Sequence, residues 1–537
     1  MKSKRVTTAI FLGLCAVNPL SASAQIPPSI STPDKVESSI GTLEYKDGAP
    51  TIATAEKVRD ALDFTRALNV YNNSFRGASA YAMGKGFQSI GADDNTIVIF
   101  QELMDAKSLF LTANADTLYF IGVLNLSKGP LVIEQPPASL GTFNDMWFSW
   151  IIDGGFPGPD RGEGGKYLLL PPGYDGSLPD GGFFVARSKT NRVLYAFRAF
   201  LVNNDPKPAV DNIKKNLKIY PYTPGGYGTS IATALEGKVR LGGGGAPIPP
   251  TKFIDATGKS FNTIPPSDYG FFEMINENVQ QEPATSYDVE LAGQLAAIGI
   301  VKGKPFKPDA RMKKILSDAA AVGNAAGRSL NWRSAVSHPD WAYYPGSMWS
   351  SMLWEGGAFF ETPPPEFTKD GMFKPLPATG ARTLDARTAF YYAYTMDTPG
   401  MIMRIPEVGS QYLMGFVDKD NNPFEGAKTY MVTLPKGIPA RAFWSFTVYD
   451  NQSRSMLDTP QRFPRAGSQS YPSPAAEASA DGSTTIFFSP KQPQGVARGN
   501  WIQTMPGKGW FTILRLYSPL EPFFTKQWRP SEIELVR

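Results

Sequence analysis

Histidine and cysteine are almost absent from this sequence of 537 residues, which contains one of each. Zinc and non-haem iron sites that need several histidines are therefore excluded. Cys15 lies in the first apolar segment. Once that segment is removed, the chain has no disulfide, no thiolate nucleophile and no cysteine-type zinc site. His338 is the only histidine that could serve a Ser-His-Asp triad. Its surroundings, rich in proline and aromatic residues, favour a hydrogen-bonded structural histidine instead.

Long apolar runs are also lacking, except for one near the N-terminus. Three basic residues within the first five positions precede an apolar run over 6–17, and the small residues at 22–24 fit a cleavage site. We therefore predict a signal peptide over 1–24, cleavage near Ala24-Gln25, and a periplasmic or secreted protein. A lipoprotein and an uncleaved anchor are the alternatives. No later stretch is long enough to span a membrane, so we expect no span after cleavage.

Neither sign of charge is in large excess. The sequence has 53 Lys and Arg against 49 Asp and Glu, and removal of 1–24 lowers the first number to 50. A chain so close to neutrality lacks the basic balance of proteins that bind nucleic acids or membrane surfaces. We therefore expect no nucleic-acid partner.

Aromatic residues, glycine and proline are abundant, and they are spread along the chain. This composition is typical of many short strands joined by turns. We predict a mainly β fold with helical additions, in which two β-rich domains are joined by a helical middle segment. The expected divisions are an extended leader over 25–53, an N-terminal domain over 54–215, a linker and helical segment over 216–385, and a C-terminal domain over 386–537.

Local patterns predict the individual elements. Apolar runs between breakers predict strands over 117–126, 131–134, 167–170, 193–201, 411–417, 429–434, 442–449, 484–488 and 510–516. Helical spacing predicts helices over 54–71, 267–278, 288–300 and 309–331.

The first candidate site is the segment 114–119, Asn-Ala-Asp-Thr-Leu-Tyr, at the start of a predicted strand. Asp116 either caps a turn through backbone amides or acts as a base or cation ligand at the strand end. Alternation along the strand places Tyr119 on the same face as Thr117. Asp116 and Tyr119 are therefore candidate catalytic residues.

The second candidate site follows the predicted strand 442–449, in which large apolar residues alternate with polar ones as in a half-buried strand. Arg454 lies on the turn after this strand, and Lys508 lies in a loop rich in amides and indoles. Either cation could hold an anion or stabilise developing negative charge, so both are candidate catalytic residues. A structural ion pair on the turn is the alternative for Arg454.

The segment 418–422 imitates the start of a calcium-binding loop. However, its sixth position is Pro423 instead of Gly, and its twelfth is Thr429 instead of Glu. We therefore favour a hairpin turn, with Asp418 and Asp420 as the candidates for a divalent cation in the alternative case. No other cofactor is predicted.

Several motifs together resemble a bacterial exported family in which domain of unknown function 1254 precedes domain of unknown function 1214. They are Asn-x-Asp-Thr-x-Tyr over 114–119, Leu-Ser-Lys-Gly-Pro over 126–130, Tyr-Thr-Met-Asp-Thr-Pro-Gly-Met over 394–401, Asn-Trp-Ile-Gln-Thr over 500–504 and Leu-Arg-Leu-Tyr-Ser-Pro-Leu over 514–520. The resemblance implies two β-sandwich, jelly-roll-like domains similar to doubled viral capsid folds. It implies no activity and no catalytic residue.

Two functions are compatible with these patterns. The first is an exported protein that binds or processes a small organic ligand at a site of carboxylate, Arg and aromatic residues. If it is an enzyme, we expect hydrolytic or lyase-like chemistry. The alternative is a non-catalytic assembly module in which outward aromatic residues form contacts of a homo-oligomer.

Overall fold

The computed structural model describes residues 27–240, 247–351, 384–398 and 406–537. The predicted signal peptide and its cleavage site lie outside these residues. The chain divides into two units, over 1–62 and 63–537. No helix in the described part of the chain is both long and apolar enough to cross a membrane.

The first unit contains a small antiparallel sheet within the predicted leader. Its strands are β1 (Lys35–Ser38), β2 (Gly41–Lys46) and β3 (Ala49–Pro50). Helix α1 (Ile52–Ser89) begins in this unit and continues into the second one. The predicted helix 54–71 is therefore confirmed, but the structure extends it by five turns.

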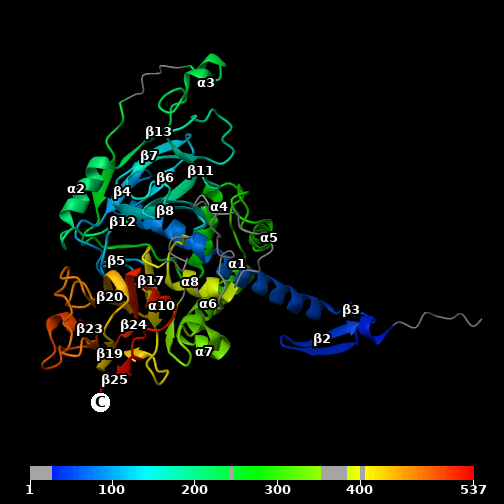
Figure 1. Cartoon of the computed structure of the whole chain (residues 1–537). Helices are drawn as coiled ribbons and strands as arrows, with labels where there is room; N and C mark the ends of the chain where they lie inside the picture. Colours follow the sequence, from blue (N-terminus) through cyan, green and yellow to red (C-terminus); the bar gives the residue numbers. More distant parts are fainter. Residues whose placement is uncertain (1–26, 241–246, 352–383, 399–405) are drawn as a thin grey trace, which may run out of the picture. The chain divides into compact units, whose positions relative to one another are not determined.

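Two sheets form the N-terminal half of the second unit (Figure 1). One has six strands in the order β14-β4-β6-β12-β8-β9, and the other has four in the order β11-β10-β7-β13. Their bounds are β4 (Thr96–Ile99), β6 (Leu118–Asn125), β7 (Leu131–Gln135), β8 (Ser139–Asp145), β9 (Trp150–Gly155), β10 (Gly165–Leu170), β11 (Phe184–Arg187), β12 (Arg192–Ala199), β13 (Lys218–Pro221) and β14 (Lys252–Asp255). Alternate residues of β6 and β12, such as Phe120 and Tyr195, share a core with Ile133 and Tyr167 of the second sheet. A separate pair, β5 (Ser108–Leu109) and β15 (Phe261–Asn262), is parallel.

The C-terminal half is built around two long central strands. β20 (Ala440–Asp450) and β24 (Gly509–Pro519) pair antiparallel in the order β16-β17-β24-β20-β21, and β18 also pairs with β24. A second sheet has the order β23-β22-β19-β25. The remaining bounds are β16 (Trp349–Ser350), β17 (Ser410–Gly415), β18 (Phe424–Glu425), β19 (Tyr430–Leu434), β21 (Arg465–Gly467), β22 (Thr484–Ser489), β23 (Trp501–Gln503) and β25 (Glu534–Leu535).

Helices account for as much of the chain as strands do. The structure has about 28% strand and 27% helix, so it is mixed α/β, whereas we expected a mainly β fold. Besides α1, the helices are α2 (Lys207–Asn216), α3 (Ile231–Leu235), α4 (Gly270–Gln281), α5 (Val289–Ala297), α6 (Ala310–Trp332), α7 (Ser334–Ser337), α8 (Leu384–Ala393) and α10 (Glu521–Phe524). The jelly-roll part of the prediction is not confirmed, and the parallel pairs β4–β14, β10–β11 and β22–β23 depart from an antiparallel order.

The long helix α1 and the helical middle segment share one large core with the C-terminal sheets. The ring centroids of Tyr71 on α1 and Phe271 on α4 are 4.2 Å apart. Asp309 caps α6 by accepting a hydrogen bond from the Met312 backbone amide. These contacts fix the helices against the sheets that carry the site described next.

Candidate functional site

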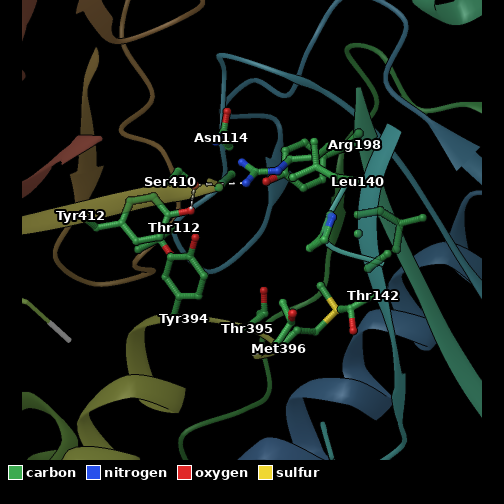
Figure 2. Close-up of a pocket in the computed structure, with 18 of the residues that line it drawn as sticks. Thr112, Asn114, Leu140, Thr142, Arg198, Tyr394, Thr395, Met396, Ser410 and Tyr412 are labelled. Atoms are coloured by element: carbon green, nitrogen blue, oxygen red, sulfur yellow. Dashed lines mark hydrogen bonds between the residues drawn. The ribbon is translucent and has the colours of Figure 1, made fainter. Parts of the chain in front are cut away.

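A cavity of about 480 Å³ lies between strands of the N-terminal and the C-terminal half. Strands β6, β8 and β12 line one side, β17 lines the other, and the segment 394–398 closes a third (Figure 2). Most of the lining is apolar, and its volume is that of a site for a small organic molecule. The apolar part of the lining includes Met83, Met104, Phe110, Ile121, Leu140, Phe156, Ala196, Phe200 and Met396.

Arg198 is one of two arginines that line this cavity, and the other, Arg441, pairs with Glu407. Arg198 lies on β12 directly opposite Tyr119 on β6 and Leu140 on β8, so the three side chains share the face that lines the cavity. Its Nη2 donates to Ser410 Oγ at 3.1 Å. Its Nη1 is buried and has no hydrogen-bond partner among the described residues. Nη1 therefore has hydrogen-bonding capacity that the described residues leave unused.

Tyr412 lies next to Arg198 on the far side of Ser410. Its hydroxyl is 2.7 Å from Ser410 Oγ, and Figure 2 shows Arg198, Ser410 and Tyr412 in one line, with the Tyr394 hydroxyl turned toward Tyr412. The guanidinium of Arg515 lies 5.6 Å from the centre of the Tyr412 ring. Tyr412 thus lies between two arginines.

The electrostatics of the site favour negative charge. Burial would raise the pKa of Tyr412, but the charges of Arg198 and Arg515 and the hydrogen bonds from Ser410 and Tyr394 outweigh it and lower that pKa. By contrast, burial raises the pKa of Tyr119. Neither Arg198 nor Arg515 makes a salt bridge within the described ranges. Arg515 instead donates to the Tyr449 hydroxyl and to the Thr112 carbonyl.

Asp116 lies outside the cavity lining, in the interface between the two halves. Its Oδ1 accepts from Arg465 Nε at 2.7 Å, and its Oδ2 accepts from Ser445 and Tyr517 at 2.6 Å and 3.0 Å. Tyr517 in turn accepts from Asn114, which lines the cavity. Asp116 therefore reaches the cavity through other side chains, and its role as a base stays a prediction.

The structure brings Tyr119 to the cavity but not Arg454 or Lys508. Arg454 is buried, its guanidinium lies 4.2 Å from the centre of the Tyr392 ring, and it donates to the Tyr392 and Gln452 carbonyls. Burial lowers the pKa of Arg454. Lys508 is half exposed and pairs with Asp450 at 3.2 Å. Their predicted catalytic roles stay untested.

The remaining predicted sites have local partners. Asp418 accepts from the backbone amides of Asp420 and Asn422, and a bridge joins Val417 to Pro423, so the favoured hairpin turn is confirmed. Within the described chain, no three residues with metal-ligating side chains come together.

The single histidine also lies away from the cavity. His338 Nε2 lies 2.9 Å from Asp385, and the imidazole stacks on Trp341 with ring centroids 4.0 Å apart. These contacts are those of the hydrogen-bonded structural histidine that we favoured.

The sequence patterns missed three of the residues that define the cavity: Arg198, Ser410 and Tyr412. A signal was present for the first, because an arginine within the apolar run 193–201 must find a polar environment when its strand is buried. Nothing local marked Ser410 or Tyr412, which meet Arg198 only through the tertiary fold.

Comparison with known proteins identifies a chain with two domains of unknown function. Residues 95–221 match the family described as protein of unknown function DUF1254, and residues 409–521 match protein of unknown function DUF1214. The chain thus carries a DUF1254 domain followed by a DUF1214 domain, and this confirms the family resemblance. Tyr119 and Arg198 come from the first domain, and Ser410 and Tyr412 from the second.

The solved structures that resemble this chain are distant in sequence. The VPA0106 protein from Vibrio parahaemolyticus is 17% identical, with a TM-score of 0.47, and the alignment covers 88% of this chain and all of that one. An uncharacterised protein from Burkholderia cenocepacia is 11% identical, with a TM-score of 0.35, over 89% of this chain and 96% of that one. No curated protein matches the chain.

Proposed function

We propose that this protein binds a small organic anion, with an apolar body and a carboxylate, in the cavity between its two domains. The observation that carries the proposal is Arg198, which lines the cavity and whose buried Nη1 has no partner among the described residues. A buried guanidinium with no carboxylate partner is costly, and a ligand carboxylate would lower that cost. The apolar lining would hold the rest of the ligand.

The predicted candidates take different parts in this proposal. Tyr119 lies opposite Arg198 and would border the ligand. Asp116 would act as a positioning residue, because it holds Tyr517 and through it Asn114 at the cavity wall. The segment 1–24 supports export, so we propose that binding takes place in the periplasm or outside the cell.

Thermal shift with matched ligands tests the proposal. Phenylacetate should raise the melting temperature of the protein, because its carboxylate can form an ion pair with Arg198. The neutral 2-phenylethanol has no such group and should not raise it. Arg198→Gln should weaken phenylacetate binding roughly tenfold or more, the scale of a lost charge-assisted hydrogen bond.

Arg187→Gln is the matched control, because Arg187 is exposed on β11 and does not line the cavity. It should bind phenylacetate as the wild type does. Equal binding by Arg198→Gln would contradict the proposal. An absence of any shift, together with a mass that grows with concentration, would instead favour the assembly module.

A further inference from the structure

The phenol oxygen of Tyr412 lies where it can accept hydrogen bonds from two neighbouring hydroxyls. Ser410 Oγ already accepts from Arg198, so its own hydrogen can be donated to Tyr412 at 2.7 Å. Tyr394 also hydrogen-bonds to Tyr412. When Ser410 and Tyr394 both donate, the Tyr412 oxygen accepts two hydrogen bonds, which is the role of a phenolate.

The charges around Tyr412 favour the same state. Arg198 and Arg515 flank it from two different strands, β12 and β24, and neither makes a salt bridge in the described part of the chain. The two positive charges lower the pKa of Tyr412 against the effect of burial, whereas burial raises the pKa values of the neighbouring phenols. The titratable and charged groups that face Tyr412 are Tyr119, Arg198, Tyr394, Arg515 and Tyr517.

Among the lining residues that the structure describes, no unpaired carboxylate competes with Tyr412 for the role of base. Glu407 is the one carboxylate among the described lining residues, and its Oε2 accepts from Arg441 at 2.7 Å. A phenolate is a much stronger base than a carboxylate, because the ordinary pKa of tyrosine is about 10 and that of glutamate about 4.3. Such a base suits protons of low acidity, including those on carbon next to a carbonyl.

We propose that Tyr412 is a catalytic base that removes a proton from the carbon next to the carbonyl of a bound 2-oxo acid. The inference rests on the proposed function, because Arg198 must hold the carboxylate. The C–H bond breaks and an O–H bond forms on Tyr412, while the electron pair moves onto the carbonyl oxygen to give an enolate. Arg198 stabilises that oxyanion. When the proton on Tyr412 is replaced by one from solvent and that one passes to the ligand carbon, the phenolate is restored, so hydrogen exchange needs no co-reactant other than water.

The position of the two groups supports this step. Arg198 and Tyr412 both bind Ser410, so an acid held by the guanidinium lies within reach of the phenolate. A 2-oxo acid presents its carboxylate and its carbonyl oxygen side by side, and this pair matches the forked donors of arginine. The reacting carbon is then the next atom along the ligand.

Two measurements on the full-length protein test the inference. The first follows the loss of the C3 proton signal of phenylpyruvate in D₂O by nuclear magnetic resonance, corrected for the protein-free rate. The wild type should accelerate exchange, and Tyr412→Phe should reduce the added rate at least a hundredfold. The second follows tyrosine ionisation by absorbance at 295 nm without ligand. One phenol should titrate below the ordinary range, and Tyr412→Phe should lose that step.

Tyr220→Phe is the control, because Tyr220 lies on β13 and its hydroxyl donates to Glu134, away from the cavity. It should keep both the exchange activity and the low-pH titration step. Thermal shift by phenylpyruvate shows whether each variant is folded and binds. If phenylpyruvate binds but exchange is absent or survives in Tyr412→Phe, the base is wrong and the binding proposal stands. If neither phenylpyruvate nor phenylacetate binds, the proposed function fails and this inference fails with it.

Discussion

Asp116 and Arg465 form an ion pair in which neither side chain has exposed surface. The two residues belong to different domains, and Ser445 and Tyr517 complete the hydrogen bonds of the carboxylate. Such a pair adds little compared with apolar packing, but the loss of one partner leaves a buried charge without compensation. The role of Asp116 that its contacts support is therefore to hold the two domains together beside the cavity.

Asp116→Asn should lower the free energy of unfolding by about 3–5 kcal/mol, because Arg465 would keep its buried charge without a counter-ion. Urea denaturation followed by tryptophan fluorescence measures the change. Asp318→Asn is the control, since Asp318 forms an exposed pair with Lys314 on α6 and should have no measurable effect. Similar small losses in both variants would show that the interface does not depend on the buried pair.

At the scale of the single residue, sequence patterns identified side chains that could take part in chemistry, but not the residues that these side chains contact. They selected Asp116 and Tyr119 because a carboxylate and a phenol stand at a strand end. They could not indicate that Asp116 meets Arg465, 349 positions away, or that Tyr412 comes next to Arg198. These contacts depend on how two sheets pack, and no local spacing contains that information.

Elements were predicted well where one face is buried and poorly where all faces are buried. Helix α1 was expected to end at Tyr71, because its apolar periodicity ends there. In the structure every residue from 74 to 84 is buried, so polar and apolar faces no longer alternate. In the same way, β20 was predicted as a half-buried strand, but it is buried on both faces from Phe443 to Asp450. One face meets the C-terminal core and the other meets the N-terminal domain.

Close packing of helix α6 offers a test at this scale. A Cβ added at Gly327 would lie 2.5 Å from Tyr392 Cγ, and that ring is held by Asn324 and Arg454. Gly327→Ala should therefore lower the free energy of unfolding by about 1–3 kcal/mol, the usual cost of overpacking. Gly293 on α5 has nothing within 4 Å, so Gly293→Ala should raise stability by about 0.5–1 kcal/mol. Thermal or urea denaturation of both variants measures the two changes in the free energy of unfolding. Stabilisation by Gly327→Ala would show that the Tyr392 ring can move aside.

At the scale of the molecule, the two domains of the second unit share one core. The largest apolar cluster contains residues of α1 and β6 as well as residues of β20 and β24. Polar contacts cross the same boundary, since Tyr449 donates to the Ala113 carbonyl and Arg515 to the Thr112 carbonyl. The sequence predicted strands in both halves, and sheets are present in both, although the structure is mixed α/β. The sequence could not predict that each half buries the polar residues of the other.

The C-terminal domain should therefore not fold alone. A fragment of residues 406–537 would carry Arg465 and Arg515, both fully buried in the whole chain, without Asp116 and the Thr112 carbonyl that they contact. The loss of these interdomain contacts, together with an apolar face exposed to water, should prevent cooperative folding. We expect the isolated fragment to lack near-ultraviolet circular dichroism and a sharp melting transition. Adding the rest of the chain as a second fragment should restore both. A sharp transition in the isolated fragment would show that the domains fold first and associate afterwards. In that case the cavity between them would depend on docking, and phenylacetate should strengthen the association of the two fragments.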